Sequence, residues 1–206
     1  MAKHATSIDA QIARRIRQKG SGAVFTPADF LDLGSRNAVD LALSRRARGG
    51  NIRKLARGLY DTPRIDAALG ALAPSTDDIA NALRDRDGAR LQAAGAHAAN
   101  LLGLSDQVPV RVVFLTDGRS RTVRLGRRQI VLKHTTPKQM ATAGRVSGTV
   151  IQALRWLGQR HVTPDTVAAV RRRLSDADRQ QLLRDIRYAP AWIAAIFRDL
   201  AAPRKT

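Results

Sequence analysis

Apolar residues recur every four positions near the start of the chain, and this spacing predicts an amphipathic helix over residues 7–19. The residues that set the spacing are Ile8, Ile12 and Ile16. A short strand is expected next, over residues 23–26. Thr26 followed by Pro27 is typical of a helix start, because threonine caps the first turn and proline needs no hydrogen-bond partner there. A second, short helix is therefore expected around residues 29–31.

A third helix is predicted over residues 35–48, with Ser35 as its N-cap and Gly49 as its end. Its apolar side consists of Val39, Ala42, Leu43 and Ala47. Its polar side consists of Arg36, Asn37, Asp40, Ser44, Arg45 and Arg48. Arg46 interrupts the apolar side, so we expect its alkyl stem to lie along the core while its guanidinium reaches water.

A basic β-hairpin is predicted directly after this helix. Short apolar runs at Ile52, Leu55 and Leu59–Tyr60 suit strands, and Arg57-Gly58 supplies a turn. The predicted order is helix, short strand, helix, turn, helix, hairpin, which is that of a winged helix-turn-helix. We therefore predict a DNA-binding domain of this kind over residues 1–64.

Residues 65–206 are predicted to form a second domain, because the stretch around residues 62–75 has turn residues and little periodicity. A clear strand is expected over 110–116, and a hairpin over 121–134 with Gly126 at its bend. After Lys138 the apolar spacing becomes helical to the end. The fold class is therefore expected to be α+β, with a small mixed α/β domain that ends in a bundle of short helices.

Composition favours a polyanionic partner. The formal net charge is +19 and the isoelectric point is about 11.7, so phosphate-rich molecules would be attracted strongly and in a salt-dependent way. The chain has no cysteine, which is compatible with a reducing cytoplasm. Neither a run of about 18 apolar residues nor a signal peptide is found, so we expect a cytoplasmic protein without a membrane partner.

The helix over residues 35–48 is the predicted base-reading element, since the DNA major groove admits a helix and distinguishes all four base pairs. Arginine can bind guanine through two hydrogen bonds, and asparagine can bind adenine in the same way. Asp40 either accepts from a cytosine amino group or orients Arg36 or Ser44. The predicted reading residues are Ser35, Arg36, Asn37, Asp40, Ser44 and Arg45. Phosphate contacts are expected from Arg53, Lys54 and Arg57 on the hairpin, the wing.

A second basic cluster lies in the predicted hairpin of the second domain. Its members are Arg119, Arg121, Arg124, Arg127, Arg128 and Lys133. The sequence leaves open whether this cluster contacts DNA, a toxin or neither, and the oligomeric state stays open as well.

Enzymatic activity has little support in the sequence. The four histidines, His4, His97, His134 and His161, lie far apart and lack a metal-binding spacing. Phosphate-binding loops, nucleophile elbows and the acidic residue of a restriction-type nuclease are also missing. His97 is expected to be a packed structural residue, and no cofactor or metal is expected.

The run FTPADFLDLGSRNAVDLALSRRARGGNIRKLARGLYDTP resembles the N-terminal DNA-binding segment of AbiEi-family antitoxins, the regulatory half of type IV toxin-antitoxin systems. Later runs, GAHAANLLGLSDQVP, VVFLTDGRSRTV and LLRDIRYAPAWI, resemble the same family, so the similarity extends from about Ile8 to Leu200. It implies an autoregulating repressor that opposes a nucleotidyltransferase toxin without necessarily binding it. The reading and wing roles then fall to the residues given above.

Two alternatives remain. One is a module that binds structured RNA, although only 4% of the residues are aromatic and few lie among the basic runs. The other is an interaction protein that neutralises a toxin directly.

Overall fold

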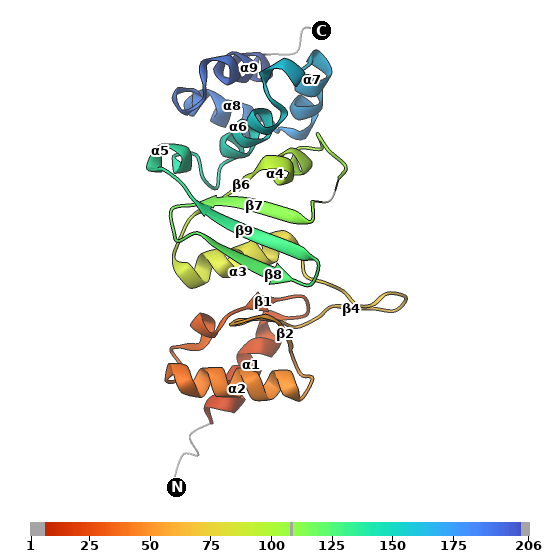
Figure 1. Ribbon diagram of the computed structural model, residues 1–206, viewed down its shortest axis with the longest axis vertical. Helices are drawn as coiled ribbons and strands as arrows, with labels where there is room; N and C mark the ends of the chain where they lie inside the picture. The colour runs from red at the N-terminus through yellow and green to blue at the C-terminus, as the bar shows by residue number, and fades with distance from the viewer. Residues whose placement is uncertain (1–6, 108, 203–206) are drawn as a thin grey trace. The chain divides into compact units, whose positions relative to one another are not determined.

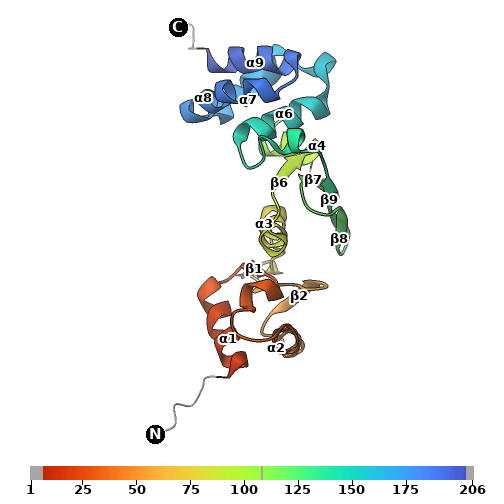
Figure 2. The same cartoon turned by 90° about the vertical axis from the view of Figure 1, so that its left-hand side faces the viewer.

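A computed structural model describes residues 7–107 and 109–202 (Figures 1 and 2). The chain has a mixed α and β structure and divides into two compact units, Met1–Gly88 and Ala89–Thr206. The sequence suggested a domain boundary after residue 64, whereas the compact units divide after Gly88. The difference arises because the segment after residue 64 includes a helix, α3 (Thr76–Asp87), that packs against the first unit's strand β1 (Val24–Phe25).

The first unit begins with the elements that the apolar spacing predicts. They are α1 (Ile8–Lys19), β1, the 3₁₀ helix η1 (Pro27–Phe30), α2 (Arg36–Arg48), β2 (Arg53–Ala56) and β3 (Leu59–Asp61). The helix expected after Pro27 is a single 3₁₀ turn. Thr26 and Asp29 cap that turn reciprocally, but Ser35 already begins the next helix, so few residues remain for a longer one.

The core of the first unit lies between α1, α2 and a three-stranded antiparallel sheet of order β1-β3-β2. Phe25 stands edge-on to Phe30, with ring centroids 5.6 Å apart, and stacks on Tyr60 at 6.3 Å. Gly34 lets the loop before α2 approach α1, because a Cβ there would lie 2.7 Å from the Ile8 Cδ1 atom. The loop at Gly34 therefore lies directly against the start of α1.

A buried ion pair joins the strands of this sheet. Asp61 on β3 is 1% exposed and lies opposite Arg53 on β2. The Arg53 guanidinium donates to both Asp61 oxygens, from Nε at 3.0 Å and from Nη2 at 2.6 Å. Arg53 Nη2 also donates to the Leu72 carbonyl at 2.7 Å. One guanidinium thus ties the hairpin to the chain that follows it.

The stretch of turn residues in which the sequence placed the domain boundary contains a small hairpin. Its strands are β4 (Ile65–Asp66) and β5 (Gly70–Ala71), which pair with each other. The helix α3 follows, with Ser75 as its N-cap and Gly88, at φ 58°, as its left-handed C-cap.

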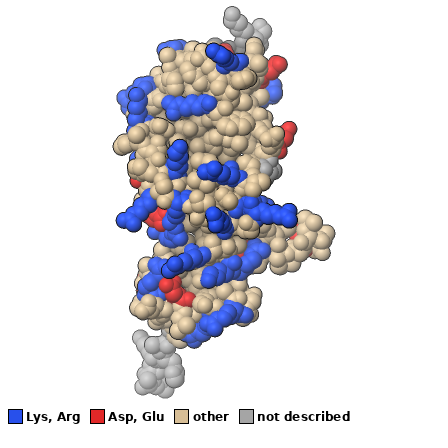
Figure 3. Space-filling model, viewed as in Figure 1, with Lys and Arg blue, Asp and Glu red and all other residues tan. Residues whose placement is uncertain are grey.

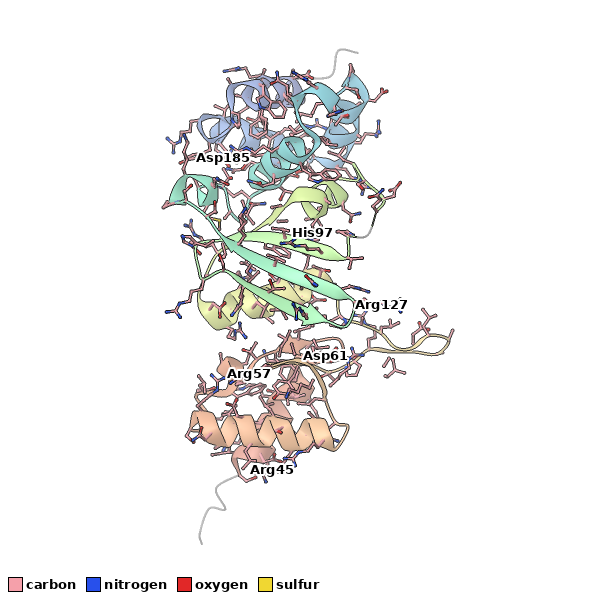
Figure 4. The ribbon with its side chains drawn as sticks, in the orientation of Figure 1. Arg45, Arg57, Asp61, His97, Arg127 and Asp185 are labelled. Atoms are coloured by element: carbon pink, nitrogen blue, oxygen red, sulfur yellow. The ribbon has the colours of Figure 1, made fainter. Side chains whose placement is uncertain are left out.

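The second unit contains a four-stranded sheet of order β6-β7-β9-β8. Its elements are β6 (Leu91–Ala94), α4 (Gly95–Leu101), β7 (Arg111–Thr116), β8 (Arg121–Leu125) and β9 (Arg128–His134). The predicted strand and the predicted hairpin around Gly126 are confirmed. The structure adds a parallel pairing of β7 with β9, while the other neighbours are antiparallel. The buried His97 ring stands edge-on to Phe114, with centroids 5.2 Å apart, which fits the structural role expected for it (Figure 4).

Short helices complete the second unit, as the apolar spacing predicts. They are α5 (Pro137–Met140), α6 (Val146–Leu157), η2 (Gln159–His161), α7 (Pro164–Arg173), α8 (Asp176–Arg184), η3 (Ile186–Tyr188) and α9 (Ala191–Ala201). Asp185, 2% exposed, joins α8 to α6 by accepting from the Ser147 hydroxyl and from Gln181 Nε2 at 2.9 Å and by pairing with Arg145 at 3.1 Å (Figure 4). No helix in the described ranges is long and apolar enough to cross a membrane.

Removing the carboxylate of Asp61 should destabilise the first unit strongly. Asp61→Ala leaves the Arg53 guanidinium half-buried without its partner, and such a loss costs about 3 kcal/mol of unfolding free energy. Asp61→Asn keeps the shape and should give a smaller loss. Urea unfolding measures both, and Asp40→Ala, which breaks the exposed pair with Arg36, serves as the control. Equal losses for Asp61→Ala and Asp40→Ala would contradict the structural role of the buried pair.

Acid should weaken the second unit through Asp117. The Arg90 side chain donates to this carboxylate from Nε at 2.8 Å, and the Arg90 backbone N–H donates at 2.7 Å. These bonds hold the pKa of Asp117 below its ordinary value of 3.8. A carboxyl group whose pKa is lower in the folded chain stabilises the fold at pH values above its pKa in the unfolded chain. This stabilisation is lost as the pH falls through the pKa of the folded chain. The stability difference between the natural chain and Asp117→Asn should therefore be present at about pH 7 and shrink below about pH 4. A difference that is unchanged in acid would refute this origin.

Candidate nucleic-acid interface

The outer side of α2 presents a continuous polar surface. Ser35 caps the helix, its Oγ accepting from the Ala38 N–H at 3.4 Å, while Val39 and Leu43 are buried. The helical repeat then places the opposite side chains in solvent. Its exposed members are Asn37, Leu41, Arg45 and Arg48. Figure 4 shows Arg45 on the side of α2 that faces away from the sheet.

Arg36 and Asp40 form an ion pair along the edge of this surface. The Arg36 Nε atom lies 2.9 Å from Asp40 Oδ2, and the two side chains are 58% and 46% exposed. The structure thus shows the contact with Arg36 that was one of the expectations for Asp40, while acceptance from a cytosine amino group stays a prediction. A carboxylate in this position also limits how Arg36 can turn toward a ligand.

Leu41 is a member of the surface that the sequence pattern did not single out. It is 51% exposed at the middle of the polar side of α2. The signal was present in its position, since Leu41 lies out of register with the apolar side of the helix. An exposed leucine among polar groups can contact a thymine methyl group in a major groove.

Arg46 departs from the expectation that its guanidinium reaches water. Its side chain is only 18% exposed, and its Nη2 atom donates to the Asp9 carbonyl at 2.8 Å and to the Asp9 carboxylate. Asp9 lies in the first turn of α1. The guanidinium stays beside the core because the two Asp9 acceptors lie there. The contact joins α2 to α1.

The hairpin β2–β3 carries two exposed cations next to α2. Lys54 and Arg57 are exposed and have no ion pair with the described residues. Gly58, at φ 65°, closes the turn beside Arg57. Arg53, which the sequence grouped with them, instead binds Asp61 and the Leu72 carbonyl. Its hydrogen bond with Asp61 raises the pKa of Arg53, so it remains a fixed cation within the sheet. The hairpin surface thus consists of Lys54 and Arg57.

Two further cations of the first unit are held by aspartates. Arg15 makes a two-pronged contact with Asp32, at 2.6 and 2.7 Å, and Lys19 lies 2.7 Å from Asp29. The contact with Arg15 lowers the pKa of Asp32. These pairs fasten α1 to η1, which contains Asp29, and to the loop before α2, which contains Asp32.

The basic cluster of the second unit is divided between the two sides of its sheet. Residues that pair across strands share a side, and the register joins Arg124 to Gln129 and Gln129 to Arg111. Lys133 follows Gln129 by four positions on β9 and therefore shares that side. We name Arg111, Arg124 and Lys133 the basic sheet face; all three are exposed and have no ion pair with the described residues.

The other cluster members lie elsewhere. Arg121 and Arg128 belong to the opposite side, and Arg119 and Arg127 lie in connecting turns. Arg111 was not in the predicted cluster, because its strand is distant in sequence and only the parallel pairing brings it to Gln129. Figure 3 shows Lys and Arg side chains spread over the view in which Figure 1 draws β7, β9 and β8, with fewer acidic groups.

The comparisons with known proteins place the chain in a family. It matches DUF6088, a family of unknown function, over residues 11–182, which is most of its length. The chain belongs to the DUF6088 family. No significant match was found among curated proteins or among solved structures.

This DUF6088 member shows no group of three or more His, Cys, Asp or Glu side chains arranged to hold a metal, as far as residues 7–107 and 109–202 are concerned. His4 lies outside those ranges. The first unit presents hydrogen-bonding and cationic side chains on α2 and further cations on the hairpin. Side chains of these kinds can bind a ligand through hydrogen bonds and charge.

Proposed function

We propose that this protein is a sequence-specific double-stranded DNA-binding protein that represses transcription. The observation that carries the proposal is the exposed polar side of α2, Asn37, Leu41, Arg45 and Arg48, together with the unpaired cations Lys54 and Arg57 on the hairpin of the same unit. A helix of this width fits the major groove, and a basic hairpin beside it suits the neighbouring phosphates. The net charge of +19 supports a polyanionic partner.

We interpret the first unit as a winged helix-turn-helix. The order of α1, β1, η1, α2, β2 and β3 and the sheet order β1-β3-β2 support this interpretation. The second helix of the motif is reduced to the η1 turn. In this interpretation α2 is the recognition helix and the hairpin β2–β3 is the wing.

Base reading is assigned to the first half of α2 and to Arg45. Asn37 can bind an adenine edge through two hydrogen bonds, and Arg45 can bind guanine. Arg36 approaches DNA together with Asp40, so this pair can present a donor and an acceptor side by side. Ser35 and Ser44 lie at the margins, since Ser35 caps the helix and Ser44 is half-buried.

The physiological role that we propose is that of an autoregulating antitoxin of a type IV toxin-antitoxin system. The support for this narrower step is the resemblance of the chain to AbiEi-family antitoxins. The proposed counterpart is a nucleotidyltransferase toxin, opposed without a required complex. A nucleotidyltransferase reading frame next to the gene, with toxicity relieved by this chain, is the expected finding, and a toxin-free neighbourhood would leave only the repressor.

Substitutions on α2 and on the hairpin should have different effects. Asn37→Ala and Arg45→Ala should lower the ratio of specific to non-specific affinity by roughly tenfold each, because each removes a two-bond base contact. Lys54→Ala with Arg57→Ala should weaken all duplexes alike and reduce the slope of log affinity against log salt by about two.

Fluorescence anisotropy with the DNA upstream of the reading frame, a scrambled duplex and a structured RNA separates these outcomes. Unchanged preference in Asn37→Ala and Arg45→Ala would refute the assignment of α2. Equal affinity for RNA and DNA would favour an RNA-binding module instead.

The basic sheet face should add phosphate contacts from the second unit. Its cations span roughly 10 Å across the strands and 13 Å along them, so replacing all three with alanine should lower the salt slope by about two to three. A control variant that removes the same charge from exposed helical sites replaces Arg155, Arg160 and Arg198. Equal effects of the two variants would show that only net charge matters.

A further inference from the structure

The hairpin β4–β5 is an apolar arm. We use this name for residues 64–72, which extend away from the rest of the first unit (Figure 1). Ile65 is 69% exposed and Leu69 is 78% exposed, more than any other large apolar side chain in the described ranges. The two strands of the arm pair with each other and with no third described strand. Apolar groups of this kind lie in water in the single chain, where their exposure is unfavourable.

The exposure of the arm is built into an ordered structure. Asp66 Oδ1 accepts from the backbone N–H groups of Ala68 and Leu69, both at 2.9 Å, which fixes the turn. At the base, the Leu72 N–H donates to the Arg64 carbonyl at 2.8 Å, and the Leu72 carbonyl accepts from Arg53. The arm is thus anchored to the buried Arg53–Asp61 pair and holds its apolar side chains outward.

The outer part of the arm does not suit a nucleic-acid partner. The one cation of the arm, Arg64, lies at its base, and the strands and turn beyond it carry a single charge, the carboxylate of Asp66. That carboxylate would repel phosphate. In a protein of charge +19, such a segment suits a protein surface that is apolar and basic.

A surface of that description lies in the second unit. A groove of about 760 Å³ runs between α7 and α9. Its apolar lining consists of Val162, Pro164, Val167, Ala168, Trp192 and Ile196. The pair Arg171–Asp199, at 2.8 Å, joins the two helices and so holds the groove in shape. Arg172 lines the same groove, is exposed and has no ion pair with the described residues.

We propose that the arm of one chain docks in the α7–α9 groove of a second copy of this chain. Ile65 and Leu69 would occupy the apolar lining, and Asp66 would bring a negative charge toward Arg172. A reciprocal exchange would place the arm of each copy in the α7–α9 groove of the other. The contact is small, and we therefore expect a weak dimer. This inference does not depend on the proposed DNA binding.

Cysteine cross-linking tests the contact directly, because the natural chain has no cysteine. Two single variants, Leu69→Cys on the arm and Ala168→Cys in the groove, are mixed and oxidised. Differential tags on the two variants identify the mixed dimer. We expect a disulfide-linked mixed dimer in this pair and several-fold less when Ala168→Cys is replaced by Ala177→Cys, an exposed site on α8. Equal yields in the two mixtures would overturn the proposal. A disulfide between two chains of the Leu69→Cys variant that forms in higher yield than the mixed dimer would overturn it as well.

Sedimentation velocity gives a second readout on cysteine-free protein. The double substitution Ile65→Ser and Leu69→Ser should raise the dimer dissociation constant roughly tenfold or more, since it removes two apolar groups from the contact. The thermal midpoint should stay unchanged, because both side chains are exposed in the single chain. A natural chain that stays monomeric at high concentration would also overturn the proposal.

Discussion

The buried ion pair between Asp61 and Arg53 is the interaction on which the first unit depends. It joins the two strands of the hairpin at the point where the third strand of the sheet begins, and its guanidinium also binds the carbonyl of Leu72. A carboxylate that is 1% exposed needs such a partner, because an unpaired buried charge is strongly unfavourable. The position of the hairpin beside α2 and the direction of the apolar arm therefore follow from one pair of side chains. The surface that we propose for DNA and the surface that we propose for a second copy share this support.

The distribution of charge explains how a protein with so many arginines retains a defined surface. Its 36 basic residues outnumber its 17 acidic ones, and every acidic residue is an aspartate. Several aspartates hold particular arginines within the fold, as Asp9 holds Arg46 and as Asp32 holds Arg15. Those cations act as clamps between elements. The cations of the hairpin and of the basic sheet face have no such partner among the described residues, and they are the ones to which we assign the proposed phosphate contacts.

Much of the fold could be predicted from local patterns. Caps, apolar spacing and glycines identify α1, α2 and the hairpins, because these features depend on neighbours in sequence. The remaining features depend on pairs that are distant in sequence. No periodicity in the sequence indicates these contacts. They are the parallel pairing of Arg111 with Gln129, the hydrogen bond from Arg53 to the Leu72 carbonyl and the ion pair of Arg46 with Asp9. For the candidate site, sequence placed the polar side of α2 correctly, yet it assigned Arg53 to phosphate contact and passed over Leu41, because composition does not show which arginines already have partners.

Selection of bound duplexes from a random library by the full chain at physiological salt tests whether α2, as we propose, reads base sequence in double-stranded DNA. The bound duplexes are sequenced after successive rounds. We expect enrichment of one short motif, retained when salt is raised enough to remove non-specific binding. Recovery of duplexes without any shared motif, or binding that disappears uniformly with salt, would contradict it.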